Sequence, residues 1–360
     1  MAAAILIIEP SGCFKDRLFA ALGFRLTTEQ TGFSKGHSQT TSEGKEKEVS
    51  APGSQSIRRR LVGNNVWLGH TEAGPEQSLA GLEVKAIRPD VLDTEEAVGR
   101  AMFEEIEQAA AAKQGELVII LLGGRGAQAL HRLLGEMART NRADALLGRL
   151  HVFTQDALAP MRMDNGLSFV RDFERLLGED FFRKVKSFNS MRTDTDDLEG
   201  ELVRYIDKLE SLGGIDIFFL GHGPEADAAS HLAYIKPGSG ATHMDVAGMI
   251  PISSSILEHH ISKFKAGGSR VTEADEAECR AATHILTLGP AAILGAQRIV
   301  QSIVDASTAP GKRASYRRVL ETELAADPAE RASQLDENPG LWVRLHPSVR
   351  SIVLPDVLQP

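Results

Sequence analysis

The chain has 360 residues, enough for one large or two modest α/β domains. Apolar residues make up 42% of it and charged residues 25%, the balance of a soluble globular protein, which excludes a wholly disordered or collagen-like chain. The net charge is −9, so the attraction that drives non-specific nucleic-acid binding is absent overall, and we expect no nucleic-acid partner.

Cysteine content and hydropathy indicate the compartment. Cys13 and Cys279 are too few for a disulfide framework and lack the CxxC spacing of a zinc site, which fits a reducing cytoplasm. The apolar run at residues 2–8 has no basic residues before it and meets Glu9 and Pro10 too early for a signal peptide. Since no stretch approaches 18 uninterrupted apolar residues, we expect no membrane span.

Residues 1–83 are predicted to form an N-terminal extension around a polar segment. Between about 34 and 60, Ser, Gly, Thr, Gln, Lys and Glu dominate, which predicts a mobile loop or linker. The segment ends at Arg58-Arg59-Arg60, which we interpret as solvated side chains without chemistry. The elements expected on either side of it are a strand at 4–8, a weak helix at 15–22, and strands at 65–68 and 82–87.

From about residue 93 onward, helical and strand patterns alternate, beginning with a helix start at Asp93 and Glu96. The expected elements are a helix from 93, strand 117–122, a helix from 127, strand 150–154, helices 169–177 and 198–212, strands 215–220 and 284–288, helices from 291 and over 314–320, and strands 342–345 and 351–354. Apolar strands separated by helices predict a three-layer α/β/α domain over 84–360 with a mostly parallel, Rossmann-like sheet. Ligands should bind in the loops after Leu122, Thr154, Leu220 and Leu288, beyond the carboxyl ends of the strands.

Two of these loops carry the first candidate residues. Gly123, Gly124 and Arg125 lie between a strand and a helix, where backbone N–H groups and the helix N-terminus favour an anion such as phosphate; a purely steric role for the glycines is the alternative. Asp156 follows the strand at 150–154, where a carboxylate can move a proton between adjacent sugar carbons. A helix cap is the alternative role for Asp156.

Two later segments carry the remaining candidates. His222, Glu225, Asp227 and His231 follow a buried strand in a glycine-rich loop and form a plausible acid/base cluster, although loop hydrogen bonding alone is the alternative for the histidines. The loop has no HExxH pattern and no nearby cysteine, so we predict no metal site. Lys312, ahead of a predicted helix, can hold a phosphate as a point charge, or else be a solvated residue at the helix start.

Taken in order, these loops resemble the glucosamine-6-phosphate deaminase/isomerase family, which includes 6-phosphogluconolactonases. The similar segments are 117–124, 152–156, Gly-Gly-Ile-Asp-Ile-Phe-Phe-Leu-Gly-His-Gly at 213–223, His-Leu-Ala-Tyr-Ile-Lys-Pro-Gly at 231–238, 283–289, and Leu-His-Pro at 345–347. They span about residues 84 to 356. The resemblance implies aldose–ketose isomerisation with loss of ammonia from an amino-sugar phosphate, without metal or organic cofactor, in a homo-oligomer.

The resemblance also implies roles for individual residues. Asp156 is the base that moves a proton between C1 and C2, and His231 opens the ring. Either Glu225 or Asp227 takes the place of the family's aspartate beside the histidine, and the sequence leaves this choice open. The residues implied to hold the phosphate are Gly123, Gly124, Arg125, Lys312, and Lys263, which stands in Ser-Lys-Phe where the family has Ser-Arg-Phe.

One departure from the family pattern motivates other functions. Lys236 stands where the family has a glutamate, and a lysine cannot orient a histidine as a carboxylate does. One alternative is therefore a non-catalytic regulator that binds a sugar phosphate. Another is a 6-phosphogluconolactonase-like hydrolase, which we rank lower because Asp156-Ala157-Leu158 lacks the Asp-Glu-Arg sequence usual in lactonases.

Overall fold

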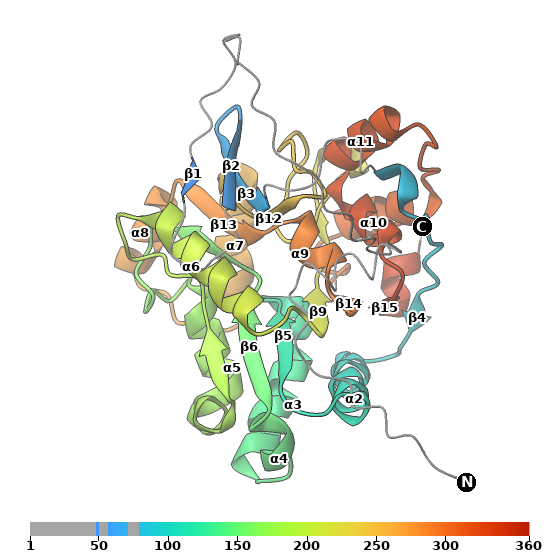
Figure 1. The fold of residues 1–360 in the computed structure, drawn as a ribbon. Helices are drawn as coiled ribbons and strands as arrows, with labels where there is room; N and C mark the ends of the chain where they lie inside the picture. The colour runs from blue at the N-terminus through green and yellow to red at the C-terminus, as the bar shows by residue number, and fades with distance from the viewer. Residues whose placement is uncertain (1–47, 50–56, 71–78, 360) are drawn as a thin grey trace, which may run out of the picture.

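The computed structural model describes residues 48–49, 57–70 and 79–359, which form two large sheets and one two-stranded sheet with helices around them (Figure 1). The strand expected at 4–8, the helix expected at 15–22 and most of the polar segment lie outside the described residues.

The larger sheet has seven parallel strands in the order β4-β15-β14-β9-β5-β6-β8. These strands are β4 (Asp90–Val91), β5 (Leu117–Leu121), β6 (Leu150–Thr154), β8 (Ser187–Asn189), β9 (Ile217–Leu220), β14 (Arg298–Ile303) and β15 (Val349–Val353). The three adjacent strands β9, β5 and β6 are buried along their whole length, as expected for strands covered on both faces. The predicted α/β fold with a mostly parallel sheet is confirmed.

The two faces of the parallel sheet bury different partners. Along β5, Leu117, Ile119 and Leu121 pack with one set of helices, while Val118 and Ile120 point to the opposite face, as the two-residue period of a strand requires. The first face is covered by α2 (Glu95–Ala112), α3 (Gln128–Arg139) and α5 (Phe169–Lys184). The second is covered by α6 (Leu198–Ser211), α9 (Pro290–Leu294), the 3-10 helix η4 (Pro339–Leu345) and the second sheet.

This second sheet is antiparallel and was not predicted. Its order is β1-β2-β3-β12-β13-β7, with β1 (Glu48–Val49), β2 (Ile57–Val62), β3 (Asn65–His70), β12 (Asp245–Pro251), β13 (His284–Leu288) and β7 (Asp156–Ala159). Strand β13, expected among the parallel strands, pairs antiparallel with β12 and β7 instead. Consequently the loop after Leu288 does not join the other three predicted ligand-binding loops.

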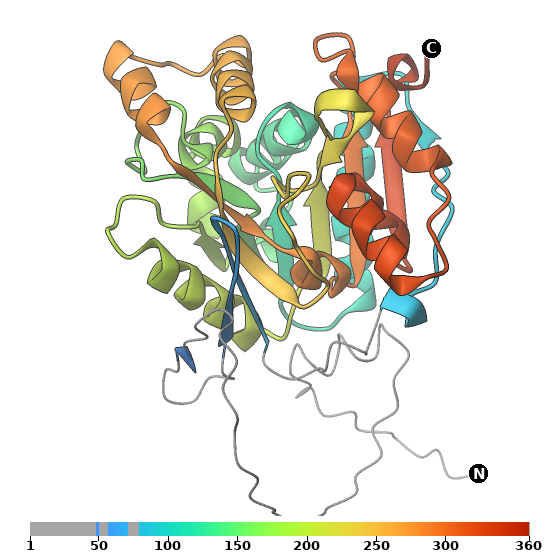
Figure 2. The ribbon, with the colours of Figure 1, turned by 90° about the horizontal axis from the view of Figure 1, so that it is seen from above.

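Residues 57–70 form a hairpin that packs on the main body beside β12 (Figure 2). The Trp67 side chain is fully buried, and its indole Nε1 donates to the Ser239 carbonyl at 2.9 Å. The predicted loop is therefore wrong at its C-terminal end: Arg59 lies on β2 and pairs with Glu199 at 2.8 Å, and Arg60 bonds to Asp245. Arginine stems can lie along a strand when their guanidinium groups reach carboxylates.

Two other predicted strands are wrong for identifiable reasons. Residues 82–87 form no strand, and arginine side chains meet the backbone there: the Arg331 guanidinium donates to the Leu82 carbonyl, and Arg344 Nε to the Lys85 carbonyl. Residues 342–345 belong to η4, which starts at Pro339. A short, fully buried apolar run does not distinguish a strand from a helix by its pattern.

The remaining elements complete the fold. They are α4 (Asp144–Leu147), α7 (Ser254–Ala266), α8 (Glu273–Ala281), α10 (Gly311–Glu321), α11 (Pro328–Glu337), β10 (Gly223–Pro224), β11 (Ser230–His231), and the 3-10 helices η1 (Leu79–Gly81), η2 (Arg125–Ala127), η3 (Ala226–Ala228) and η5 (Pro355–Leu358). Among the described helices, none is both long and apolar enough to cross a membrane.

Candidate active site

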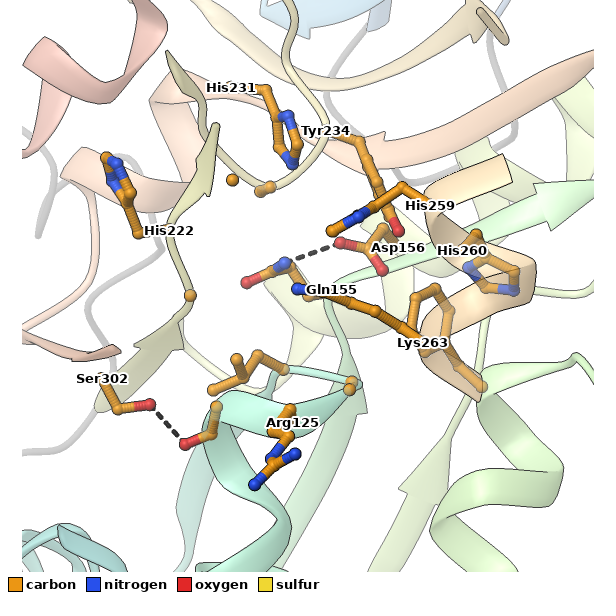
Figure 3. Close-up of a pocket in the computed structure, with 18 of the residues that line it drawn as sticks. Arg125, Gln155, Asp156, His222, His231, Tyr234, His259, His260, Lys263 and Ser302 are labelled. Atoms are coloured by element: carbon orange, nitrogen blue, oxygen red, sulfur yellow. Dashed lines mark hydrogen bonds between the residues drawn. The ribbon is translucent and has the colours of Figure 1, made fainter. Parts of the chain in front are cut away.

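A pocket lies beyond the carboxyl ends of β5, β6 and β9, where ligands bind in sheets of this kind (Figure 3). The loops after these three strands, helix α7 and the start of α10 contribute its walls. Seven of the nine predicted site residues line it: Gly123, Gly124, Arg125, Asp156, His231, Lys263 and Lys312. Residues more than 180 positions apart in the sequence thus meet at one point.

Asp156 lies near the middle of the pocket (Figure 3) and is the first residue of β7, so it is not a helix cap. Its side chain is almost fully buried, and Gln155 Nε2 donates to its Oδ2 at 2.6 Å. Burial raises the pKa of the Asp156 carboxyl to about 7, with the Gln155 hydrogen bond acting in the opposite direction. A carboxyl with this pKa can both take up and release a proton near neutral pH.

His231 is held against Glu225 at the edge of the pocket. Strand β11, which contains His231, pairs with β10, and Glu225 follows β10 directly, so the imidazole Nδ1 lies 2.6 Å from Glu225 Oε1. The ring of Tyr234 stacks on the imidazole with centroids 5.3 Å apart. Neither carboxylate is among the residues that line the pocket, but Asp227 is exposed in η3, whereas Glu225 is in contact with the imidazole. The choice that the sequence left open between two carboxylates therefore falls on Glu225.

Lys236 is bound to another part of the chain. Its ammonium Nζ donates to the Pro251 carbonyl at 2.6 Å, and the residue does not line the pocket. The carboxylate beside His231 thus comes from the longer loop between β10 and β11 and not from the position that the family pattern suggested.

The glycines of the pocket are required by close contacts. A Cβ atom at Gly223 would lie 1.7 Å from His231 Nε2, so a side chain there would displace the imidazole. A Cβ at Gly123 would lie 2.0 Å from the ring of Phe169. Gly124 has a φ of +76°, a conformation that side chains disfavour. Gly123 and Gly124 are therefore required for steric reasons, as the alternative in the sequence analysis stated. Because neither has a side chain, their backbone faces the pocket.

Two lysines and one carboxylate form the cationic end of the pocket. Lys263 Nζ, from α7, lies 2.9 Å from Asp305 Oδ2, and Lys312 Nζ, from α10, bonds to Asp305 Oδ1. Burial alone would oppose ionisation of Asp305, but the two ammonium groups hold its pKa well below the usual range. Burial and the charge of Lys263 lower the pKa of Lys312 to about 8. Lys312 is buried, so it is not a solvated residue at a helix start.

Arg125 has a carboxylate partner of its own. Its Nη2 lies 2.7 Å from Glu95 Oε1, and this hydrogen bond raises the pKa of the guanidinium. In Figure 3 the guanidinium points away from Asp156. A contact of Arg125 Nη2 with a phosphate, as the resemblance implies, would require this pair to separate.

Sequence reasoning missed several residues of the pocket. His222 was considered only as part of an acid/base cluster; it is buried and its Nε2 lies 2.8 Å from Ser315 Oγ. His259 and His260 on α7 also line the pocket, and their adjacent positions in the sequence were the available signal. Burial lowers the pKa of His222 and His259 to about 3 and that of His260 to about 4, so all three are neutral at pH 7.

A larger cavity, of about 550 Å³, lies between the β2–β3 hairpin, β12 and α11. The acid among the described residues that line it, Asp245, is bound by Arg60 and faces no second carboxylate there. The cavity is also lined by His70, whose Nε2 lies 2.9 Å from Glu210 Oε1, but no lysine is among the described residues that line it, so it lacks the two ammonium groups of the smaller pocket. Within residues 48–49, 57–70 and 79–359, no group of three or more His, Cys, Asp or Glu residues could hold a metal ion.

Comparisons with known proteins agree with this fold. No protein-family model matches the chain. The chain is similar in structure to a monomeric glucosamine-6-phosphate deaminase (TM-score 0.56, 19% identity, 75% of this chain and 98% of the other) and to the 6-phosphogluconolactonase from Trypanosoma cruzi (TM-score 0.52, 15% identity, 76% and 97%). At these identities the likeness establishes the fold.

Sequence similarity to curated proteins is local. A stretch of 59 residues, 16% of this chain, is 39% identical to glucosamine-6-phosphate deaminase of Bacteroides thetaiotaomicron and covers 20% of that protein. A stretch of 56 residues is also 39% identical to the Bacteroides fragilis enzyme, covering 19% of it. The chain thus matches about a fifth of the length of these relatives. Together with the structures, these matches confirm the resemblance to glucosamine-6-phosphate deaminases and 6-phosphogluconolactonases.

A side chain at position 223 tests the close contact between Gly223 and His231. Gly223→Ala should displace the imidazole from Glu225, because the new methyl group would overlap the ring. In the NMR spectrum, the His231 side-chain resonances should shift in Gly223→Ala. Glu225→Gln should shift these resonances in the wild-type background but no longer in the Gly223→Ala background. Gly81→Ala, where a Cβ meets nothing within 4 Å, is the matched control. Unchanged His231 resonances in Gly223→Ala would contradict the geometry.

The burial of Asp156 makes the stability of the protein depend on pH. Because its folded-state pKa is raised from 3.8 to about 7, Asp156 favours folding below pH 4, and this contribution is lost as pH rises through 7. Asp156→Asn, which cannot ionise, should therefore be more stable than the wild type at pH 8, by up to about 4 kcal/mol at about 1.4 kcal/mol per pKa unit.

Thermal unfolding between pH 4 and pH 8 measures this difference, which should vanish towards pH 4. Asp164→Asn, at an exposed carboxylate, is the control and should follow the wild type throughout. A stability difference between Asp156→Asn and the wild type that is the same at every pH would show that Asp156 is not desolvated.

Proposed function

We propose that the chain is a sugar-phosphate deaminase/isomerase that converts an amino-sugar 6-phosphate to a ketose phosphate with release of ammonia. The observation that carries this proposal is the meeting, in one pocket, of a buried carboxyl with a pKa near 7, a histidine–carboxylate pair and two lysines. Acid/base chemistry at adjacent sugar carbons needs the buried carboxyl and the histidine–carboxylate pair. Binding of a phosphate tail needs the two lysines.

In the proposed reaction, His231 and Glu225 act first. The imidazole, oriented through its Nδ1 by Glu225, moves the proton that opens the sugar ring. This role uses the free Nε2, which the absent side chain of Gly223 leaves room for. The open chain then exposes C1 and C2 to the carboxyl group in the middle of the pocket.

Asp156 acts second. In its ionised form it takes the proton from C2 and, now protonated, returns that proton to C1. The C1 carbonyl oxygen becomes a hydroxyl by taking the proton that the C2 amine gives up as the C2–N bond becomes an imine. Water then hydrolyses the imine to the ketone, releasing ammonia. A pKa near 7 suits this shuttle, because the same carboxyl must be base and then acid within one turnover. No step requires a cofactor.

A lactone hydrolase is the second candidate function. The His231–Glu225 pair could equally activate a water molecule for attack on a 6-phosphogluconolactone, and a lactonase is among the structures with a similar fold. The two reactions differ in their need for Asp156: only the isomerisation requires a group that carries a proton between two carbons.

Turnover measurements test the proposal. Ammonia release and ketose phosphate formation from glucosamine 6-phosphate should be detectable, and Asp156→Asn should lower kcat by about 10²- to 10⁴-fold while substrate still binds. The rate at saturating substrate should rise with pH through the Asp156 transition, since only the ionised carboxylate accepts the C2 proton. Asp164→Asn is the matched control.

Hydrolysis of 6-phosphogluconolactone, measured in parallel, separates the candidates. Turnover of the lactone with none of the amino sugar would replace the proposal by the second candidate. Binding of sugar phosphates by folded protein without turnover of either compound would identify a non-catalytic regulator and refute both.

A further inference from the structure

The turn that follows His231 has an unusual backbone. Its two central residues, Ala233 and Tyr234, have φ angles of +47° and +57°. On either side of them, the Leu232 N–H donates to the Ile235 carbonyl at 3.1 Å, and the Ile235 N–H donates to the Leu232 carbonyl at 2.7 Å. Two-residue turns with positive φ at both positions favour asparagine and glycine, and a large aromatic side chain in this conformation is an outlier. The backbone at Tyr234 is therefore strained.

Contacts on both sides of the turn hold this conformation. Thr287 Oγ1, from β13, donates to the Ala233 carbonyl, and the Thr287 backbone lies opposite Asp156 in the ladder of β13 and β7. On the other side, the Tyr234 ring stacks on the His231 imidazole, with centroids 5.3 Å apart and planes at 22°. Strained residues persist where the surrounding structure imposes them, and they concentrate at active sites. The turn thus connects the strand of the buried carboxyl to the histidine.

The Tyr234 ring also faces a second aromatic residue of the pocket, Phe169. The two ring centroids lie 6.3 Å apart, with an angle of 46° between the planes, which is within the range of aromatic contacts. The Phe169 ring in turn occupies the space that a Cβ atom at Gly123 would need. His231, Tyr234, Phe169 and Gly123 all line the pocket. Tyr234 therefore links the imidazole, by contact, to the aromatic side chain that packs on the glycine turn.

The His231 imidazole needs a second contact to stay in one orientation. Its interaction with Glu225 fixes Nδ1 only, and the ring can still tilt about that bond, because the terminal torsion of a histidine side chain has a broad energy minimum. A flat ring stacked on the imidazole opposes this tilt, since tilting would separate the two faces. Among the described residues, Tyr234 is the aromatic residue that stacks on His231.

The hydroxyl group of Tyr234 is not needed for this contact. Burial raises the pKa of the Tyr234 phenol well above its usual range, and the charge of Asp156 acts in the same direction. The phenol therefore stays protonated at neutral pH and takes no proton from a ligand. Because phenylalanine has the same ring without the hydroxyl, Tyr234→Phe separates the two parts of the side chain.

We propose that Tyr234 is a positioning residue: the strained turn holds its ring against His231 and so fixes the plane of the imidazole while Nδ1 stays at Glu225. The inference rests on the proposed function, in which His231 opens the sugar ring, and it adds the residue that orients the imidazole together with Glu225. Tyr234 acts through His231 and does not itself exchange a proton with the ligand.

NMR spectra of the His231 side chain, recorded at one fixed pH without ligand, test the geometry independently of activity. In the wild type, the ring current of Tyr234 should shift the imidazole ring protons upfield. Tyr234→Leu should lose this shift, and Tyr234→Phe should keep it. Phe182→Leu is the matched control, since it removes a ring that packs on Phe181 and Phe188 outside the pocket.

Turnover of glucosamine 6-phosphate tests the consequence for the reaction. Tyr234→Leu should lower kcat by about 10²-fold with KM little changed, because a tilted imidazole no longer meets the proton that it transfers. Tyr234→Phe should keep most of the rate, and Phe182→Leu should match the wild type. A structural loss alone would instead lower the amount of folded protein and leave kcat per folded molecule unchanged.

Either measurement can overturn the role of Tyr234. Unchanged His231 resonances in folded Tyr234→Leu would refute it, as would a wild-type kcat in that variant. If the wild type turns over no amino-sugar phosphate, the proposed function fails, and the resonances alone still decide the positioning role. Should Tyr234→Leu fail to fold, Thr287→Val decides, because it removes the hydrogen bond that holds the turn: His231 resonances that stay at their wild-type positions would contradict the inference.

Discussion

The pocket depends on the point where the chain leaves one sheet and enters the other. Strand β6 pairs in the parallel sheet up to Thr154, and from Asp156 the chain pairs antiparallel with β13 as β7. The single residue between them, Gln155, is fixed by its backbone carbonyl, which accepts from the Leu288 N–H, and by its side chain, which donates to Asp156. This junction buries a carboxylate at the carboxyl end of a parallel strand, where the pKa of the carboxyl is raised and a ligand has access.

Around this carboxyl, charges are organised in pairs. Glu225 holds His231, Glu95 holds Arg125, and Asp305 holds two lysines. Pairing keeps buried charges tolerable before a ligand arrives and fixes where the hydrogen-bonding groups point. It also limits what the pocket can accept, because a ligand must fit a charge balance that the protein has already established.

The sequence predicted the parallel sheet because its strands are apolar throughout, a pattern that depends only on local composition. It could not predict the antiparallel sheet. Strand β7 has only four residues, and β12 includes Gly248 and begins and ends with residues that also occur in loops. Both strands pair with β13, which lies about 130 residues after β7 and about 40 residues after β12, so the sheet depends on contacts between distant segments.

The pocket residues divide in the same way, into those that the local sequence predicts and those that depend on contacts between distant segments. Asp156, His231, Lys263 and Lys312 were found because they follow strands or stand in segments that resemble the deaminase family. Asp305 was missed because it stands in no recognisable sequence motif. Its importance follows from its contacts with lysines on two other elements, which the sequence alone does not show. The place of Glu225 beside His231 depends on how the β10–β11 hairpin turns, so the sequence could only narrow it to two residues.

The most direct test is a crystal structure with glucitol 6-phosphate, an open-chain sugar phosphate that has no carbonyl and cannot turn over. We expect its phosphate to lie between Lys263, Lys312 and the Gly123-Gly124 turn, with C1 and C2 beside the Asp156 carboxyl. A ligand bound in the larger cavity near Trp342, or one bound in the pocket with its phosphate beside Asp156, would contradict it.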